Sequence, residues 1–239
     1  MQDYHVWQSA TLVESYLTGV RGQIPLAAEQ LDVLLRLIAG SHSQVANFLD
    51  LGCGDGILTA TLLARYPQAR GLLFDISEPM LAAARQRLAP YAAQLAIVNA
   101  DYSTPEWLHH THVCARFDVI VSGFSIHHQP DARKRALYAE LYQLLKVGGI
   151  FINLEHVQSA TPWGEQLFDD CLIDAFHTAS QGAKTRDEIA QQHHSRPDKA
   201  ANILATVENQ CDWLRQIGYQ DVDCYFKFFE LALFAGRKA

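Results

Sequence analysis

The chain has 239 residues, enough for one α/β domain with a full core, and we expect a single domain over residues 1–239. Its hydrophobic content of 49% is typical of a globular protein, and no apolar run approaches the ~20 residues that a membrane-spanning helix needs. A net charge of -7 argues against nucleic-acid binding, which usually requires a basic face. Residues 1–10 lack the pattern of a secretion signal, so we expect a cytoplasmic protein.

Cysteine and histidine give little indication of covalent or metal cross-links. The five cysteines are scattered, odd in number and contain no Cys-x-x-Cys pair, so we expect reduced thiols rather than disulfides. Two clusters offer metal ligands, one within residues 109–114 and one at His193-His194. Neither contains a helical i, i+4 histidine pair or a neighbouring carboxylate, and we therefore expect solvated loops and no metal site.

Two helical patterns precede the first strand. Residues 12–22 are weakly amphipathic, and leucine and isoleucine recur at helical spacing over residues 31–38. We expect the second helix to pack on the core. The first carries Tyr16 and Arg21 and is free to act as a flap, with a purely structural helix as the alternative. Together they make an N-terminal helical flap over residues 1–40.

From Val45 onward, strand and helix patterns alternate. Buried strands are predicted at residues 45–51, 71–75, 95–99, 117–122 and 150–154. Helices are predicted at residues 58–65, 77–88 and 131–146. Each strand–helix–strand unit implies parallel neighbours, and a parallel sheet binds its ligand at the carboxyl ends of its strands.

After the fifth strand the alternation stops. Residues 163–180 and 186–194 have helical patterns with no strand between them, so we expect a helical cap insertion over residues 158–206. The chain ends with two alternating apolar runs, residues 222–228 and 231–234. They are too close together for a crossover helix and must pair as an antiparallel hairpin.

Residues 48–58 link the first strand to its helix through three alternating glycines. Gly52, Gly54 and Gly56 permit the positive φ angles of a tight reversal, and the N–H groups of the following helix favour an anionic ligand group. A dinucleotide fingerprint would need glycine at position 57, where the chain has Ile57. A phosphate-binding P-loop would need a lysine that is absent, and a plain strand-to-helix turn is the alternative.

The pattern Asp50-x-Gly52-x-Gly54-x-Gly56 resembles motif I of the class I S-adenosylmethionine (SAM) methyltransferases. Further stretches match this superfamily at the expected strand ends. These stretches are Asp75, Asp101-Tyr102, residues 117–122 and residues 145–149. The resemblance implies an α/β fold with a doubly wound, Rossmann-like sheet of seven strands. Such a sheet is mostly parallel, and here it would end in the C-terminal antiparallel hairpin.

The same resemblance assigns roles to residues at the strand ends. Asp75 would accept both ribose hydroxyls of SAM, with a helix-capping acid as the alternative, and Asp101 would accept from the adenine amino group. Tyr102 or Met80 would cover a face of the ring, whereas Arg21 would bind the methionine carboxylate or lie on the surface. The full set expected to contact SAM and its product, S-adenosylhomocysteine (SAH), is Tyr16, Arg21, Asp50, Gly52, Gly54, Gly56, Asp75, Ile76, Met80, Asp101, Tyr102 and Ser122.

Methyl transfer requires little from the protein beyond alignment, because the sulfonium methyl of SAM is already reactive. A base is needed only where the acceptor must lose a proton, and it must lie at a strand end that faces the cofactor. The candidates are His127 and His128 after the fourth strand, with Glu155 and His156 after the fifth. For His128, a packing role is the alternative.

Three functions follow from these patterns. We expect a methyltransferase acting on a small-molecule acceptor, because the acidic charge and the cap suit a compact substrate. The end of the chain resembles small bacterial and archaeal methyltransferases of unassigned substrate. More distantly, the flap, cap and hairpin resemble the enzymes that make carboxy-SAM for tRNA modification, although that family has asparagine where this chain has Gly123. An NAD-dependent oxidoreductase would fit Asp75 but not Ile57.

The expected partners follow from the same reasoning. We expect a small-molecule acceptor, no membrane association and no nucleic acid, and a homodimer is compatible with the sequence.

Overall fold

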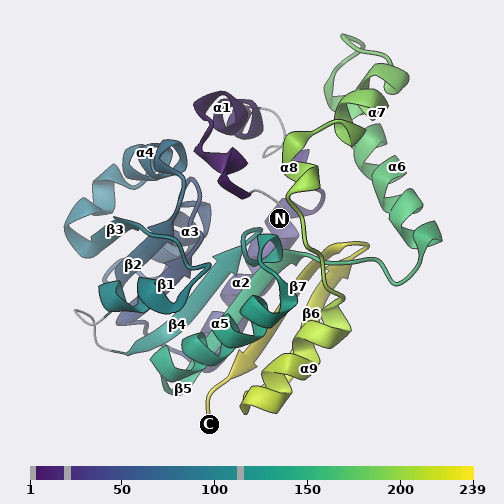
Figure 1. The fold of residues 1–239 in the computed structure, drawn as a ribbon. Helices are drawn as coiled ribbons and strands as arrows, with labels where there is room; N and C mark the ends of the chain where they lie inside the picture. Colours follow the sequence, from purple (N-terminus) through teal and green to yellow (C-terminus); the bar gives the residue numbers. More distant parts are fainter. Residues whose placement is uncertain (1–3, 19–22, 112–115) are drawn as a thin grey trace.

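The computed structural model describes residues 4–18, 23–111 and 116–239, which fold around a central sheet (Figure 1). Within these ranges the sheet has seven strands in the order β3-β2-β1-β4-β5-β7-β6. The strands are β1 (Asn47–Leu51), β2 (Arg70–Asp75), β3 (Leu95–Asn99), β4 (Phe117–Gly123), β5 (Leu145–His156), β6 (Gln220–Phe228) and β7 (Leu231–Arg237). The order reverses between β1 and β4, and doubly wound sheets bind their ligands in the crevice at that point.

The strand directions match the predicted topology. β1 pairs in parallel with β2 and β4, β2 with β3, and β4 with β5. Among the described strands, only β7 runs in the opposite direction, and it pairs with both β5 and β6. Two residues, Phe229 and Glu230, join β6 to β7, which confirms the C-terminal hairpin and the mostly parallel Rossmann-like sheet.

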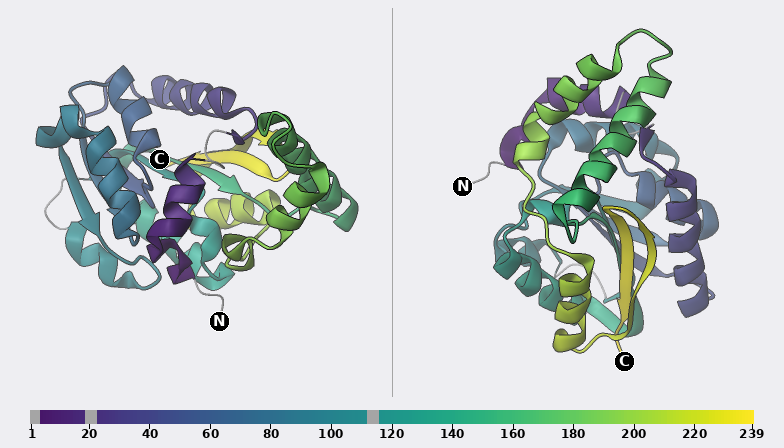
Figure 2. Two further views of the ribbon diagram at one scale, coloured as in Figure 1. Left: turned by 90° about the horizontal axis from the view of Figure 1, so that it is seen from above. Right: turned by 90° about the vertical axis from the view of Figure 1, so that its right-hand side faces the viewer.

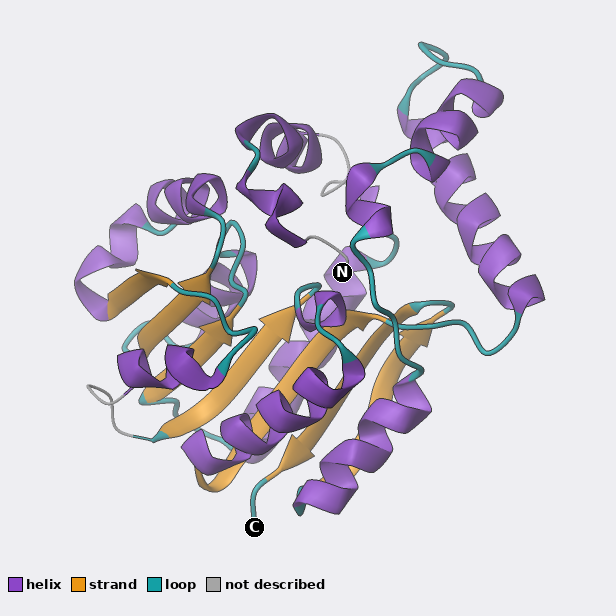
Figure 3. Ribbon diagram, in the orientation of Figure 1, coloured by secondary structure: helices purple, strands orange, loops and turns teal. Residues whose placement is uncertain are grey.

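Helices cover both faces of the sheet (Figure 3). One face packs against α2 (Ala27–Ser41), α3 (Ile57–Arg65) and α4 (Glu78–Arg87). The opposite face packs against α5 (Asp131–Leu144), α9 (Val207–Ile217) and the 3-10 helix η4 (Pro105–Thr111). β1, β4 and β5 supply fully buried aliphatic and aromatic side chains to both layers, as expected for strands that are covered on both sides.

A third group of helices lies at the carboxyl end of the strands, as the views in Figure 2 show. It contains η1 (Tyr4–Gln8) and α1 (Ala10–Thr18) from the start of the chain. The segment between β5 and α9 adds α6 (Pro162–Ala179), α7 (Arg186–His194) and α8 (Pro197–Ala200). We call α6, α7 and α8 the cap.

Local interactions stabilise the two long cap helices. The Thr161 hydroxyl accepts from the backbone N–H of Gly164 at the start of α6, and Thr185 forms a capping box with Glu188 at the start of α7. Arg186 of α7 binds Asp170 and Asp174, one turn apart on α6. These ion pairs are exposed, so they orient the two helices more than they stabilise them.

The cap helix α8 and the short 3-10 segments were not predicted. Besides η1 and η4, the 3-10 segments are η3 (Ala89–Gln94) and η5 (Ile126–His128). Segments of one turn carry no hydrophobic periodicity, so only tertiary contacts specify them. In the described part of the chain, no helix combines the length and apolarity needed to cross a membrane.

Phe151 offers a test of the core, because its ring is fully buried in β5 against Tyr138 and Tyr219. Phe151→Ala should lower the free energy of unfolding by about 3–5 kcal/mol through lost burial and a residual cavity. Val147 lies on the same strand and is 78% exposed, so Val147→Ala should change the free energy of unfolding by less than about 0.5 kcal/mol. Urea denaturation measures both values, and equal effects of the two substitutions would contradict the assigned core.

Candidate functional site

A cavity of about 670 Å³ lies between the carboxyl ends of the strands and the cap. Its floor consists of the β1–α3 turn, the end of β2 and the loop after β4, and its far wall comes from α6, α7 and α8. Trp7 of η1 and Tyr16 of α1 also line it. The cavity therefore occupies the crevice where the strand order reverses, and it is large enough for a ligand of cofactor size.

The glycines of the β1–α3 turn have different roles. All three have positive φ, with values of 67° at Gly52, 52° at Gly54 and 78° at Gly56. A Cβ atom at Gly52 would overlap the Ser125 side chain, so only glycine leaves room there for the turn and the loop after β4. Gly52 and Gly54 line the cavity. Gly56 does not; it begins α3, and a Cβ there would lie 2.7 Å from Leu88 Cδ1.

Asp75 connects the two turns that form the cavity floor. Its Oδ2 accepts from the backbone N–H of Gly54 at 2.8 Å, and its Oδ1 accepts from that of Ser77 at 2.8 Å. Loss of solvent around the carboxyl raises the pKa of Asp75, and these N–H donors oppose the rise. Asp75 does not cap α4, because the Ser77 side chain accepts from the Met80 N–H in that role, and the Asp75 carboxyl lines the cavity. Each oxygen keeps a lone pair for a ligand hydroxyl.

Asp50 is the most deeply buried carboxyl of the site. Its Oδ2 accepts from the Thr59 hydroxyl at 2.7 Å, while its Oδ1 is buried without a hydrogen-bond partner. Burial raises the pKa of Asp50 to about 7. Because Asp50 lines the cavity, a ligand cation placed beside it would satisfy the orphaned oxygen and favour the carboxylate.

Four predicted residues form the end of the cavity nearest β2 and β3. Ile76, Met80, Asp101 and Tyr102 all line it. Asp101 Oδ1 accepts from the backbone N–H of Ser103 at 2.8 Å. The Tyr102 hydroxyl bonds the Ser125 hydroxyl, and burial raises the pKa of Tyr102 above its ordinary value. An acceptor and a flat ring thus lie where an adenine is expected.

Two other predicted cofactor contacts are placed differently. Ser122 is fully buried, does not line the cavity and donates its hydroxyl to the Leu51 carbonyl at 2.8 Å. Arg21 lies outside the described residues. Tyr16 does line the cavity and packs edge-on against Trp7, with ring centroids 5.2 Å apart.

His127 and Glu155 form a buried pair. The Nδ1 of His127 lies 2.6 Å from Glu155 Oε1, and Glu155 also accepts from the backbone N–H of His156 and from the Asn153 amide. Glu155 does not line the cavity, whereas His127 does. Burial lowers the pKa of His127 well below its ordinary range and raises that of Glu155 to about 7. The imidazole is therefore neutral, and its Nδ1 faces Glu155.

His128 has the packing role that the sequence left open. Its Nε2 accepts from the Trp7 indole N–H at 3.0 Å, and its Nδ1 lies 3.3 Å from the Ala201 carbonyl. Burial lowers the pKa of His128 to about 3. Because both ring nitrogens are occupied, His128 links η1 to the end of α8 and is a poor candidate for a base.

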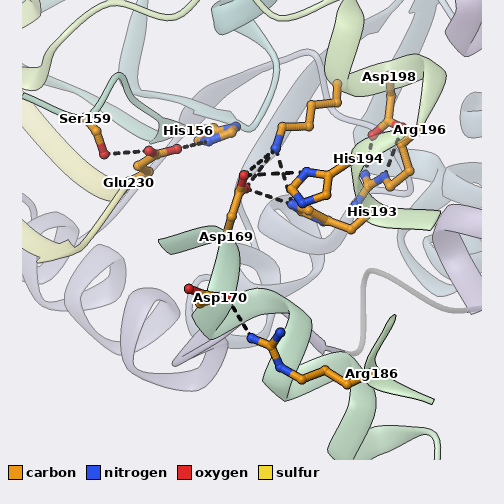
Figure 4. Close-up of polar contacts among 11 residues, drawn as sticks. His156, Ser159, Asp169, Asp170, Arg186, His193, His194, Arg196, Asp198 and Glu230 are labelled. Carbon is orange, nitrogen blue, oxygen red and sulfur yellow. Dashed lines mark hydrogen bonds and ion pairs between the residues drawn. The ribbon is translucent and has the colours of Figure 1, made fainter. Parts of the chain in front are cut away.

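His156 also lines the cavity, and its Nε2 lies 2.7 Å from Glu230 Oε2 at the β6–β7 turn. Glu230 accepts in addition from the Ser159 hydroxyl at 2.5 Å (Figure 4). These contacts tie the start of the cap segment to the hairpin.

The cap wall contains residues that sequence reasoning missed. Phe168, Leu172 and Phe176 of α6 line the cavity at four-residue spacing, a helical stripe that could have been recognised. Polar residues of the wall are Asp169, His193, Arg196, Asp198 and Lys199. Their contacts depend on how α6, α7 and α8 pack, which no local pattern encodes.

The prediction that His193-His194 lies in a solvated loop without a neighbouring carboxylate was wrong. Both lie on helix α7, and the carboxylate of Asp169 on α6 lies 2.8 Å from His193 Nε2 and 3.8 Å from His194 Nδ1 (Figure 4). Packing of α6 on α7 supplies the carboxylate that the sequence did not place there. The other cluster, within residues 109–114, lies partly outside the described residues.

Comparison with known proteins identifies residues 48–149 as a methyltransferase domain. A carboxy-S-adenosyl-L-methionine synthase of Shewanella amazonensis is 25% identical over 195 residues, which cover 78% of this chain and 74% of that protein. A trans-aconitate 2-methyltransferase of Acidovorax sp. (strain JS42) is 36% identical over 174 residues, which cover 73% of this chain and 57% of that protein.

The fold also has relatives among solved structures. An O-methyltransferase family protein from Burkholderia thailandensis aligns with a TM-score of 0.65 and 16% identity, over 90% of this chain and 56% of its own. At this identity the likeness concerns the fold alone. The chain thus spans little more than half the length of this protein and of the trans-aconitate enzyme.

Gly52 provides a test of the cavity floor. Gly52→Ala should abolish measurable SAM binding, because the new methyl group would displace Ser125 and the loop after β4. Gly148 has a φ of 82°, but a Cβ atom there would meet nothing within 4 Å, so Gly148→Ala should cost about 1–2 kcal/mol of stability and leave binding intact. Calorimetric titration with SAM measures the affinity of both variants. Wild-type affinity in a folded Gly52→Ala protein would contradict the assigned floor.

Proposed function

Because the chain belongs to the class I SAM-dependent methyltransferases, we propose that it transfers the SAM methyl group to a small-molecule acceptor held between the sheet and the cap. The observation that carries this proposal is the position of His127, whose neutral imidazole lines the same cavity as Asp75 and Gly52. A cofactor site and a candidate base therefore share one enclosed space.

The residues present fit SAM. Gly52 forms a cradle that a Cβ would fill, and the orphaned buried oxygen of Asp50 suits the ammonium of the methionine part. Asp75 retains acceptor capacity for ribose hydroxyls, and Asp101 and Tyr102 surround the expected adenine position. When bound, SAM supplies an electrophilic methyl group.

His127 is suited to receive the proton of the acceptor. Its Nδ1 faces Glu155 at 2.6 Å, so Nε2 is the ring nitrogen left to receive a proton from the acceptor. As an acceptor hydroxyl or N–H loses its proton to Nε2, the positive charge on the imidazole is stabilised by the carboxylate 2.6 Å away. Burial keeps the resting imidazole neutral, which is the form that can accept a proton. The pair can therefore act as a base at neutral pH.

The cavity wall supports a compact acceptor with both apolar and polar groups. Phe168, Leu172 and Phe176 offer an apolar surface. Arg196 and Lys199 add cations, which pair with Asp198 and Asp169 of the same wall and would have to exchange partners to bind an acceptor carboxylate. The 36% identity to a trans-aconitate 2-methyltransferase makes small carboxylic acids the first acceptors to test.

Carboxy-SAM synthesis is the second candidate, since a synthase of that name aligns over 78% of this chain. The asparagine that this family has in the loop after β4 is Gly123 here. A Cβ at Gly123 would lie 2.9 Å from Leu58 Cδ1, so a larger side chain there would require Leu58 to shift, and the glycine supplies no amide to the loop. This observation favours methyl transfer.

The proposal also covers the partners and the location of the protein. We infer a small-molecule partner, no association with membranes or nucleic acid, and a protomer able to form a homodimer. The four described cysteines are free thiols, which supports a reducing, cytoplasmic location.

The role of His127 can be tested with tritiated SAM and a panel of small carboxylic acids and phenols that includes trans-aconitate. On phenols, whose hydroxyl must lose a proton, His127→Ala should lower turnover by roughly 10²–10⁴-fold, because a general base contributes that much, and leave SAM affinity within a few-fold of wild type. Carboxylic acids are already ionised near neutral pH, so their turnover should depend far less on His127. His110→Ala, an exposed histidine of η4, is the matched control and should have no effect. Turnover of a phenol that survives in His127→Ala would remove the base from this position.

The pH profile follows from the same assignment. The base works only in its neutral form, and burial lowers the pKa of His127, so the neutral form persists as the pH falls below the ordinary imidazole value. Its partner Glu155 must stay ionised to stabilise the protonated imidazole, and burial raises the pKa of that carboxyl to about 7, so the acidic limb of kcat/KM should lie near pH 7 and follow Glu155. A limb that Glu155→Gln leaves unmoved would contradict this assignment.

A further inference from the structure

We propose that Asp169, His193 and His194 form a binding site for a divalent transition-metal ion such as Zn²⁺ or Co²⁺, in which the metal replaces the ammonium group of Lys199. The proposal is independent of the methyl-transfer assignment. It rests on the convergence of two imidazoles and one carboxylate, contributed by two different helices of the cap.

The ligand atoms have the spacing that a small cation requires. One nitrogen from each histidine and one carboxylate oxygen of Asp169 all lie within 4.8 Å of one another. Asp169 Oδ1 lies 2.8 Å from His193 Nε2, and Asp169 Oδ2 lies 3.8 Å from His194 Nδ1. Metal–nitrogen and metal–oxygen bonds of ~2.0–2.2 Å put tetrahedral ligand atoms about 3.4 Å apart. This geometry requires that the 2.8 Å contact between Asp169 and His193 open slightly and that His194, whose side chain is 55% exposed, rotate toward the carboxylate.

Lys199 marks the point at which a cation is stabilised. Its Nζ lies 2.8 Å from each oxygen of Asp169 and 3.4 Å from His193 Nε2. An ammonium is a point charge with three donors, so the site already accommodates one positive charge among these acceptors. The side chain of Lys199 is partly exposed and can leave toward solvent, which makes an exchange of ammonium for metal sterically feasible.

The chemistry of the ligand set selects the kind of metal. Two imidazoles with one carboxylate suit Zn²⁺, Co²⁺ or Ni²⁺, whereas Mg²⁺ and Ca²⁺ prefer oxygen ligands alone. Asp169 and His193 line the cavity, so an ion with three protein ligands would present its open coordination position there. The same ion would join α6 to α7, adding a second link beside the ion pairs of Arg186 (Figure 4).

Neighbouring residues provide matched controls. Asp170 follows Asp169 on α6 but binds Arg186 and is not among the candidate ligands. Lys184 lies in the cap as well and donates to Gln192 instead of Asp169. Comparing Asp169→Asn with Asp170→Asn separates the loss of a metal ligand from the loss of any cap carboxylate. Comparing Lys199→Ala with Lys184→Ala separates the loss of the competing ammonium from the loss of any positive charge in the cap.

Calorimetric titration of the tag-free, full-length protein with ZnCl₂ tests the site. We expect one Zn²⁺ per chain, affinity lowered at least ~10-fold by Asp169→Asn and by the exposed His194→Ala, and affinity raised at least ~10-fold by Lys199→Ala. Asp170→Asn and Lys184→Ala should bind as wild type. With Co²⁺, the visible ligand-field absorption should appear in wild type and disappear in Asp169→Asn.

Thermal unfolding gives a second readout, because a ligand that binds the folded state raises Tm. Zn²⁺ should raise the Tm of wild type and of Asp170→Asn, but not that of Asp169→Asn or His194→Ala. Equal Zn²⁺ affinity in Asp169→Asn and Asp170→Asn would overturn the proposal. It would also be overturned if neither wild type nor Lys199→Ala bound the ion.

Discussion

The carboxylate of Asp75 is the interaction on which the rest of the site depends. It accepts from the backbone N–H groups of Gly54 and Ser77, so one side chain holds the β1–α3 turn against the start of α4. Ser77 in turn donates its hydroxyl to the Trp7 carbonyl at 2.5 Å, and Trp7 donates its indole N–H to His128. A chain of hydrogen bonds thus runs from the cofactor floor through η1 to the loop that carries the candidate base.

This arrangement relates cofactor binding to the shape of the acceptor space. The loop after β4 contacts the floor through Ser125 and the cap through His128, whose Nδ1 faces the Ala201 carbonyl. Asp50 and Glu155 are both buried carboxyls with a pKa raised to about 7, and each faces a place where a positive charge is expected during the reaction. Their burial costs stability in the resting protein and makes them responsive to ligand charge.

Much of the fold could be predicted from the sequence, because regular strands and helices have their own hydrophobic periods. The alternation after Val45 indicated the parallel sheet, and the short link between the last two apolar runs required a hairpin. The floor residues Gly52 and Asp75 were also found, since strand ends in a parallel sheet converge. Local patterns of this kind need no knowledge of distant contacts.

Apart from the apolar stripe of α6, the missed features depend on contacts between different segments of the chain. His128 is occupied by Trp7, 121 positions away, and Asp169 meets His193 across 24 positions. Ser122 was expected to face the cofactor because it ends a strand, but its side chain points into the sheet and bonds Leu51. Side-chain direction at a strand end depends on register, which the glycine motif alone does not specify.

The central claim is that this cavity binds SAM through Asp75. Isothermal titration calorimetry with SAM, SAH and NAD, on wild type and Asp75→Ala, tests it most directly. We predict binding of SAM and SAH but not NAD, and an affinity for SAM that falls roughly 10- to 100-fold in the variant, since charge-assisted hydrogen bonds contribute about 1.5–3 kcal/mol. Asp212→Ala, at an exposed ion pair of α9, is the control. Unchanged SAM affinity in Asp75→Ala, or tight binding of NAD, would contradict the account.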